Sequence, residues 1–115
     1  MINYFRKALN RKGLIHAGNS EWSIAMQCAD KAIVTPMIYD STYITFLLEY
    51  CINHQISLIV PLFDIDLPIL AQNKQLFKDN GITLVISDFN FTQICNDKWS
   101  TYHFLKNNSF NIPET

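Results

Sequence analysis

The chain has 115 residues, of which 49% are hydrophobic and 13% aromatic, which suits one domain with its own core. Nine basic and ten acidic residues give a formal net charge of −1, which argues against nucleic acid as a partner. Apolar stretches stay well short of the roughly 18 residues of a membrane span, and the N-terminus lacks a secretory signal. We therefore expect a cytoplasmic protein with no membrane partner.

Helical and strand patterns alternate along the chain. Ile2, Phe5 and Leu9 recur at helical spacing, whereas residues 57–63 form a continuous apolar run typical of a buried strand. In chain order, we predict a helix over 2–9, strand 14–17, short helix 23–29, strand 31–35, helix 42–54, strand 57–63, helix 67–77, strand 82–86, a helix over 89–95 and a last helix over 98–106.

Small and polar residues stand where these elements should begin and end. Gly13 occupies a position typical of the glycine that follows a helix. Asp40 or Ser41 is expected to cap the helix over 42–54, and Asp88 the helix that follows the last strand. The alternation that results is typical of an α/β protein.

We predict a three-layer α/β/α sandwich with a mainly parallel, Rossmann-like sheet, because apolar strands that alternate with helices are buried on both faces. The pattern opens on a helix, so a first strand is expected to be missing. A chain lacking it is expected to form a dimer, to receive a strand from a partner or to be only marginally stable. We place an α/β domain at 1–96, followed at 97–115 by a helix and tail that lead to an absent domain.

Ligands of open α/β sheets bind beyond the carboxyl ends of the strands, and the sequence offers four such places. One of them, Ser87-Asp88 after the last strand, is explained by a helix cap. Gly18 and Asn19 follow the first predicted strand, and Asp64 and Asp66 follow the strand over 57–63. The two acids are explained either as helix-dipole partners or as a substrate-facing loop. A dinucleotide site is disfavoured, because the chain has three glycines and no G-x-G-x-x-G fingerprint.

Lys98 is a third candidate. It opens a predicted helix directly after Asn96-Asp97, and a lysine at a helix start runs against the helix dipole. Either this is a solvated charged turn, or the lysine has an anionic partner.

The three cysteines, Cys28, Cys51 and Cys95, are widely spaced among apolar neighbours, so we predict buried, reduced thiols and no zinc site. The three histidines have no nucleophile or second ligand at a recognisable spacing and are assigned to structure or surface.

Six segments then follow one family pattern: Ala29–Pro36, the predicted helix over 42–54, the run SLIVPLFDIDLPILAQNKQLF, NGITLVIS, QICNDKWSTYHFLKNN, and NIPET. Together they resemble the N-terminal (pre-ATP-grasp) domain of ATP-grasp enzymes, nearest to carbamoyl-phosphate synthase large-chain-like proteins, over residues 14–115. The most specific pieces are the P-L-x-D-x-D loop and the C-x-D-K segment.

The resemblance implies a domain of an ATP-dependent ligase that activates a carboxylate as an acyl phosphate, with ATP and Mg²⁺ as cofactors of the full-length enzyme. It implies that Lys98 lies near the ATP phosphates and that Asp64 and Asp66 face the substrate cleft. Many relatives have Glu where Asp66 stands, and many have an acid near Gly18 and Asn19. The domains that carry the adenine pocket and metal ligands are absent, so we expect the chain alone to be inactive and to bind no cofactor.

Two other functions stay open. The chain is alternatively a non-catalytic binding or regulatory module derived from such an enzyme, with a second copy of itself or the missing domains as partner. A flavodoxin-like or receiver-like domain is a weaker alternative, because the acidic cluster of a receiver is not found. The carboxylate substrate and its nucleophile are not encoded in these residues.

Overall fold

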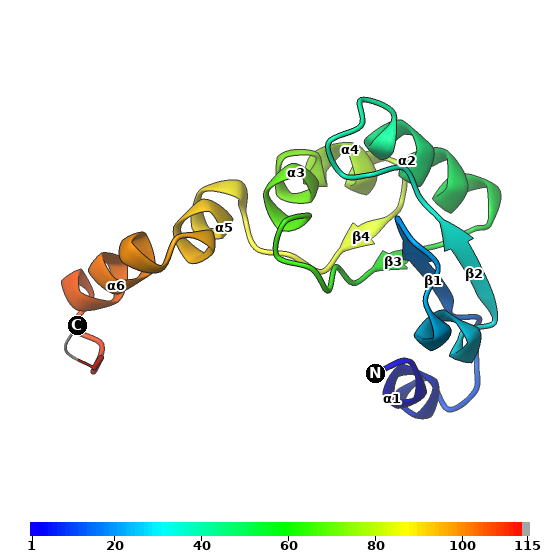
Figure 1. The fold of residues 1–115 in the computed structure, drawn as a ribbon, viewed down its shortest axis with the longest axis horizontal. Coiled ribbons are helices and arrows are strands. Elements are labelled where there is room, and N and C mark those ends of the chain that lie inside the picture. The colour runs from blue at the N-terminus through cyan, green and yellow to red at the C-terminus, as the bar shows by residue number, and fades with distance from the viewer. Residues whose placement is uncertain (114–115) are drawn as a thin grey trace. The chain divides into compact units, whose positions relative to one another are not determined.

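The computed structural model describes residues 1–113, which form a mixed α/β protein with several helices and short parallel strands (Figure 1). The chain divides into two compact units, Met1–Leu47 and a second unit that starts at Leu48, and each is described by itself. Within the described residues, no helix combines the length and apolarity that a bilayer crossing requires.

The first unit is built on one pair of parallel strands. It contains α1 (Ile2–Ala8), β1 (His16–Asn19), the 3-10 helix η1 (Ile24–Cys28) and β2 (Lys31–Val34), and α2 (Tyr43–Asn53) starts in it. Strands β1 and β2 pair in parallel, with His16 opposite Lys31 and Asn19 opposite Val34. Strand β2 agrees with the strand predicted over 31–35, and η1 lies within the short helix predicted over 23–29. Strand β1 begins two residues later than the strand predicted over 14–17 and includes Gly18 and Asn19, which were predicted to follow it.

An ion pair holds α1 to the segment that joins η1 to β2. The guanidinium of Arg6 donates to both carboxylate oxygens of Asp30, at 3.1 and 3.2 Å, and to the carbonyl oxygen of Cys28 at 2.8 Å. The same carboxylate accepts the backbone N–H of Ile15 at 2.7 Å. The Ile15 hydrogen bond, followed by that from Arg6, holds the pKa of Asp30 below its ordinary value.

The second unit repeats the parallel pairing. After the end of α2 it contains β3 (Leu58–Ile59), α3 (Leu67–Gln72), α4 (Lys74–Asp79), β4 (Thr83–Leu84), α5 (Phe89–Asn96) and α6 (Lys98–Asn107). Leu58 pairs with Thr83 and Ile59 with Leu84, in parallel. The core of this unit is formed where α3 and α4 bury Leu70 and Phe77, with Leu84 of β4 also buried.

Three local predictions are corrected. Leu9 is the C-cap of α1, and Gly13, at a φ of 92°, lies in the connection that follows. The helix predicted over 67–77 is two helices, because the Asn73 side chain donates to the carbonyl oxygen of Ile69 at 2.8 Å and Asn73 caps both. The strand predicted over 57–63 is paired only at Leu58–Ile59, since Pro61 has no N–H to donate.

Of the predicted helix caps, the one at Asp88 is confirmed. The carboxylate of Asp40 accepts the N–H of Thr42 at 2.8 Å and its hydroxyl at 2.7 Å, in the turn that precedes α2, so the cap predicted at Asp40 or Ser41 stays a prediction. Asp88 is the N-cap of α5 and accepts the N–H of Phe91 at 2.9 Å. The four described strands pair in parallel, as two separate pairs, so the three-layer sandwich and the boundary at residue 96 stay predictions.

We predict that the core of the second unit depends on Phe77, which is 0% exposed. Phe77→Ala leaves a large cavity and should lower the free energy of unfolding by about 3–5 kcal/mol in urea titrations. Phe63→Ala, at a side chain that is 60% exposed, is the matched control and should cost no more than about 0.5 kcal/mol. Equal losses in the two variants would contradict this core.

We also predict that the attachment of α1 weakens in acid. Since the folded-state pKa of Asp30 is lowered, its stabilising effect is present above the ordinary carboxyl value near pH ~3.9 and is lost as pH falls through the lowered pKa. Asp30→Asn should remove this dependence and speed exchange of the Ile15 amide hydrogen. Asp40→Asn should instead affect Thr42, and unchanged exchange of Ile15 in Asp30→Asn would refute the attachment.

Candidate functional site

Two connecting segments leave the same edge of the β3–β4 pair, because parallel strands end on the same side. Residues 60–66, here called the acid loop, follow β3 and lead into α3. Residues 85–88 follow β4 and lead into α5. This is the edge at which open α/β sheets bind their ligands.

The acid loop presents two carboxylates in different surroundings. Asp64 is exposed, whereas Asp66 is half-buried, and desolvation raises the pKa of Asp66. Asp66 occupies the N-cap position of α3, yet its side chain makes no capping hydrogen bond. Capping therefore does not account for Asp66, and its carboxyl is left available to a ligand.

A hydrogen bond fastens the acid loop to the end of α5. The side-chain amide of Asn96 donates to the carbonyl oxygen of Asp64 at 3.2 Å. Helices α3 and α5 also pack against each other. The loop is thereby held at both ends, by β3 and by the α3–α5 packing.

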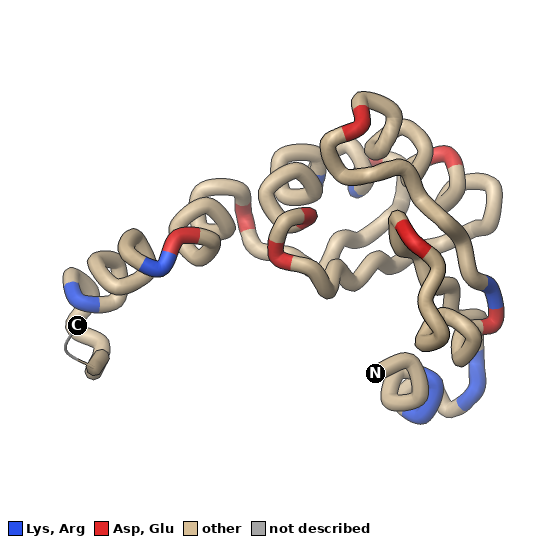
Figure 2. Tube along the Cα trace, viewed as in Figure 1, with Lys and Arg blue, Asp and Glu red and all other residues tan. Residues whose placement is uncertain are grey.

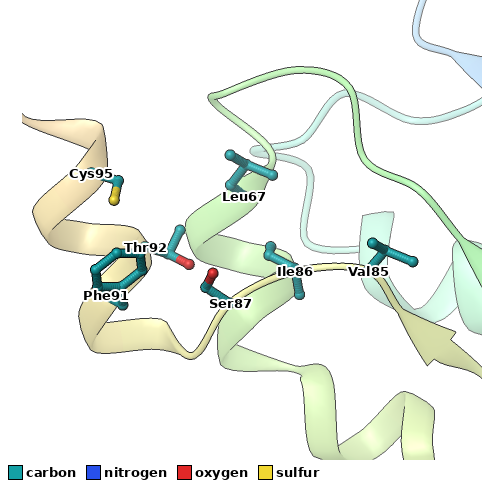
Figure 3. A pocket seen from close by; sticks show the side chains of 7 residues that line it. All are labelled: Leu67, Val85, Ile86, Ser87, Phe91, Thr92 and Cys95. Carbon is teal, nitrogen blue, oxygen red and sulfur yellow. The ribbon is translucent and has the colours of Figure 1, made fainter.

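A cavity of about 230 Å³ lies beside the acid loop, at the carboxyl end of β4 (Figure 3). Its walls come from α3, from the segment after β4 and from α5. The lining residues are Leu67, Val85, Ile86, Ser87, Phe91, Thr92 and Cys95. The lining is uncharged and mostly apolar, with two hydroxyls and one thiol.

Lys74 fixes one wall of this cavity. The residue is half-buried at the start of α4, and its ammonium donates to the carbonyl oxygen of Ile86 at 2.5 Å. Sequence reasoning missed it, although Lys74 stands against the helix dipole just as Lys98 does. The backbone carbonyl of Ile86, and not an anion, stabilises the Lys74 ammonium in this unfavourable position at the start of α4.

Lys98 is the first residue of α6 and is exposed. Asp97, the N-cap, accepts the N–H of Ser100 at 2.8 Å and also the Ser100 hydroxyl, and these two bonds lower the pKa of Asp97. Acidic residues stand at the turns before α3, α5 and α6, where helix dipoles favour them (Figure 2). Between residues 1 and 113, Lys98 forms no ion pair with Asp64 or Asp66.

Gly18 and Asn19 end β1 in the first unit. A Cβ at Gly18 would lie 3.3 Å from Cγ2 of Thr35 and 3.4 Å from Cγ1 of Ile33, so close packing of β1 and β2 favours glycine. The side-chain oxygen of Asn19 accepts the N–H of Ser20 at 3.0 Å. Both residues thus have local structural roles, and their predicted place in a substrate cleft stays a prediction.

The thiols differ from the sequence prediction. Cys51 is buried, and desolvation raises its pKa to about 11. Cys28 and Cys95 are free but exposed, so the prediction that all three are buried is wrong for these two.

The described residues contain no group of three or more His, Cys, Asp or Glu side chains placed to hold a metal ion. His54 and His103 pack on aromatic rings, with centroids 4.2 Å from Tyr50 and 4.5 Å from Trp99.

Comparison with known protein families identifies the family of this chain. The family described as "PylC-like, N-terminal domain" matches residues 1–85, which include both strand pairs and the acid loop. The chain belongs to this family. The PylC-like N-terminal domain is a pre-ATP-grasp domain of ATP-grasp enzymes. A search of curated proteins found no match.

The match identifies which candidates belong to the family pattern. Gly18, Asn19, Asp64 and Asp66 lie inside the matched residues of the PylC-like domain, whereas Lys98 lies beyond them. The cavity straddles the end of the match, since Leu67 and Val85 lie within it and the other lining residues follow it.

We predict that Lys74 holds the segment after β4 in place. Lys74→Met keeps the methylene stem but removes the bond to Ile86, and should cost about 1 kcal/mol of unfolding free energy, given partial exposure. Amide hydrogen exchange over residues 85–87 should accelerate. Lys78→Met, an exposed lysine of the same helix, is the control, and equal exchange in both variants would disprove this role.

Proposed function

We propose that the chain serves as the N-terminal domain of an ATP-grasp ligase and contributes one wall of the substrate cleft. The observation that supports this most is the family match over residues 1–85, which covers both strand pairs. The wall is formed at the carboxyl ends of the strands, where α/β proteins place their ligands. The PylC-like family supports a ligase role in general, and the carbamoyl-phosphate synthase-like specificity is a further part of the proposal.

The acid loop is the proposed contact with the substrate. Its two carboxylates suit a cationic group such as an ammonium, because Asp64 is exposed and neither acid caps α3. A ligase that joins a carboxylate to an amine has such a group in one of its two substrates. In this proposal Asp64 and Asp66 orient the amine-bearing substrate. Gly18 and Asn19, at the end of β1, are retained as further substrate-cleft candidates.

Lys98 is the proposed contact with the ATP phosphates. Its ammonium is exposed at the start of α6, and Asp97 is already engaged by Ser100. A cation at this position stabilises the negative charge that develops as a phosphoryl group is transferred. The described residues do not fit Mg-ATP by themselves, because the cavity is uncharged and Lys98 offers a single charge. ATP and Mg²⁺ are therefore assigned to the other domains of the ligase, and the chain alone is proposed to be inactive.

Exposed apolar side chains within the acid loop itself support a partner surface. Leu62 is 65% exposed and Phe63 is 60% exposed, next to the two acids. Exposed apolar side chains that cluster in this way mark interaction sites. The proposed partner is the set of ATP-grasp domains, and a second copy of the chain is the alternative.

The proposal is tested by supplying the chain, as a fusion, to a PylC-like ligase that lacks its own N-terminal domain. We expect carboxylate-dependent ADP release from the fusion and none from the chain alone. Lys98→Ala should lower kcat about 10- to 100-fold, because one charge contact to the transition state is lost. Lys106→Ala, on the same helix, should leave kcat unchanged.

Two results would contradict this function. One is Mg-ATP turnover by the 115-residue chain on its own. The other is a fusion that folds and stays inactive, which would favour a binding module that is not part of a ligase.

A further inference from the structure

The cavity at the carboxyl end of β4 is small and opens to solvent on one side. Its volume of about 230 Å³ is below the roughly 300 Å³ of common ligand pockets but above the roughly 150 Å³ of an enclosed apolar cavity that accepts benzene. Leu67 of α3, Val85 after β4 and Phe91 of α5 supply apolar surface from three separate segments. A ring-sized apolar group therefore has room between these walls.

One hydroxyl gives this cavity a polar point. Thr92 is only 4% exposed, and Figure 3 shows its hydroxyl on the side of α5 that faces Ser87. Its backbone N–H bonds to the carbonyl oxygen of Asp88, and no hydrogen bond from its hydroxyl is found among the described residues. Among the described residues, every side-chain nitrogen or oxygen atom that is fully buried has a hydrogen-bond partner. The Thr92 hydroxyl has none in this part of the chain, so it is not fully buried and opens to the cavity. A ligand in the cavity can therefore form a hydrogen bond with the Thr92 hydroxyl.

The charges around the cavity disfavour an anion. None of the seven lining residues is charged. The N-terminus of α5, which would otherwise attract an anion, is capped by the carboxylate of Asp88. Lys74 approaches the wall from α4, and its ammonium is bonded to the carbonyl of Ile86. An anionic ligand would lose hydration here without a cationic partner, which is costly.

We propose that this cavity binds a small uncharged molecule, or an uncharged substrate group, that joins a ring-sized apolar body to one hydroxyl or amide. The apolar body lies against Leu67, Val85 and Phe91, and the polar group bonds to the hydroxyls of Thr92 and Ser87. The inference goes beyond the ligase role, because the cavity is formed within this chain and needs no ATP-grasp domain.

Benzyl alcohol, toluene and benzoate are suitable probes, since they share a ring and differ in the polar group. Titration of the ¹⁵N-labelled chain should show saturable amide shifts at Ser87, Thr92 and Cys95 with benzyl alcohol. Toluene should bind more weakly, and benzoate should produce no saturable shift. Absence of saturation with benzyl alcohol, or equal binding of benzoate, would overturn the proposal.

Thr92→Val tests the polar point, because valine keeps the shape and removes the hydroxyl. We expect benzyl alcohol to bind about 3- to 10-fold more weakly and toluene to bind equally well. Thr45→Val, at an exposed threonine of α2, is the matched control and should leave both affinities unchanged. An unchanged affinity of Thr92→Val for benzyl alcohol would refute the role of the hydroxyl.

The reactivity of Cys95 provides a second measurement of binding, which uses the unsubstituted chain and needs no variant. Its thiol lines the cavity and is exposed, whereas Cys28 lies in the first unit and Cys51 is buried. Benzyl alcohol should slow alkylation of Cys95 by N-ethylmaleimide and leave Cys28 unaffected. Equal slowing of both thiols, or none at Cys95, would show that the cavity is not the binding site. Because neither readout uses ATP, these failures are distinct from a failure of the ligase proposal.

Discussion

The parallel pairing of β3 with β4 determines where the acid loop and the cavity of the second unit lie. The N–H of Thr83 bonds to the carbonyl of Ser57, and that of Val85 to the carbonyl of Ile59, each at 2.9 Å. In this register Leu84 is 3% exposed, whereas Val85 is 52% exposed. A shift by one residue would exchange the buried and exposed faces of the strand and remove Val85 from the cavity. The acid loop and the cavity share one edge because both strands end there.

Three aspartates stand before helices of this unit, and hydrogen bonding separates their roles. Asp88 and Asp97 each accept a backbone N–H of the helix that follows, so their charges stabilise α5 and α6. Asp66 holds the same position before α3 and accepts none. Burial raises the pKa of Asp66, so above that pKa its charge costs stability in the absence of a partner. A group kept at such a cost is a stronger functional candidate than one that caps a helix.

Patterns that depend on neighbouring residues were predictable from the sequence, and those that depend on tertiary contacts were not. The last helix, Lys98–Asn107, and the cap at Asp88 follow from spacing and side-chain chemistry. The break at Asn73 depends on one side-chain bond to Ile69 that competes with helix continuation. Lys74 and the cavity were missed because Ile86, Thr92 and Leu67 come together only after α3 and α5 pack. The acid loop was found because two acids after an apolar run are visible in the sequence, although Asp66 proved not to be a cap.

The acid loop and the cavity are joined by the same two helices. Consecutive residues at the start of α3 serve both, since Asp66 belongs to the acid loop and Leu67 lines the cavity. On α5, Thr92 and Cys95 line the cavity while Asn96 holds the carbonyl of Asp64 at 3.2 Å. A ligand that spreads α3 and α5 must lengthen this hydrogen bond, whereas one that fits the existing space leaves it intact. Because packed side chains tolerate little displacement, the size of an occupant governs whether the carboxylates of the loop keep their positions.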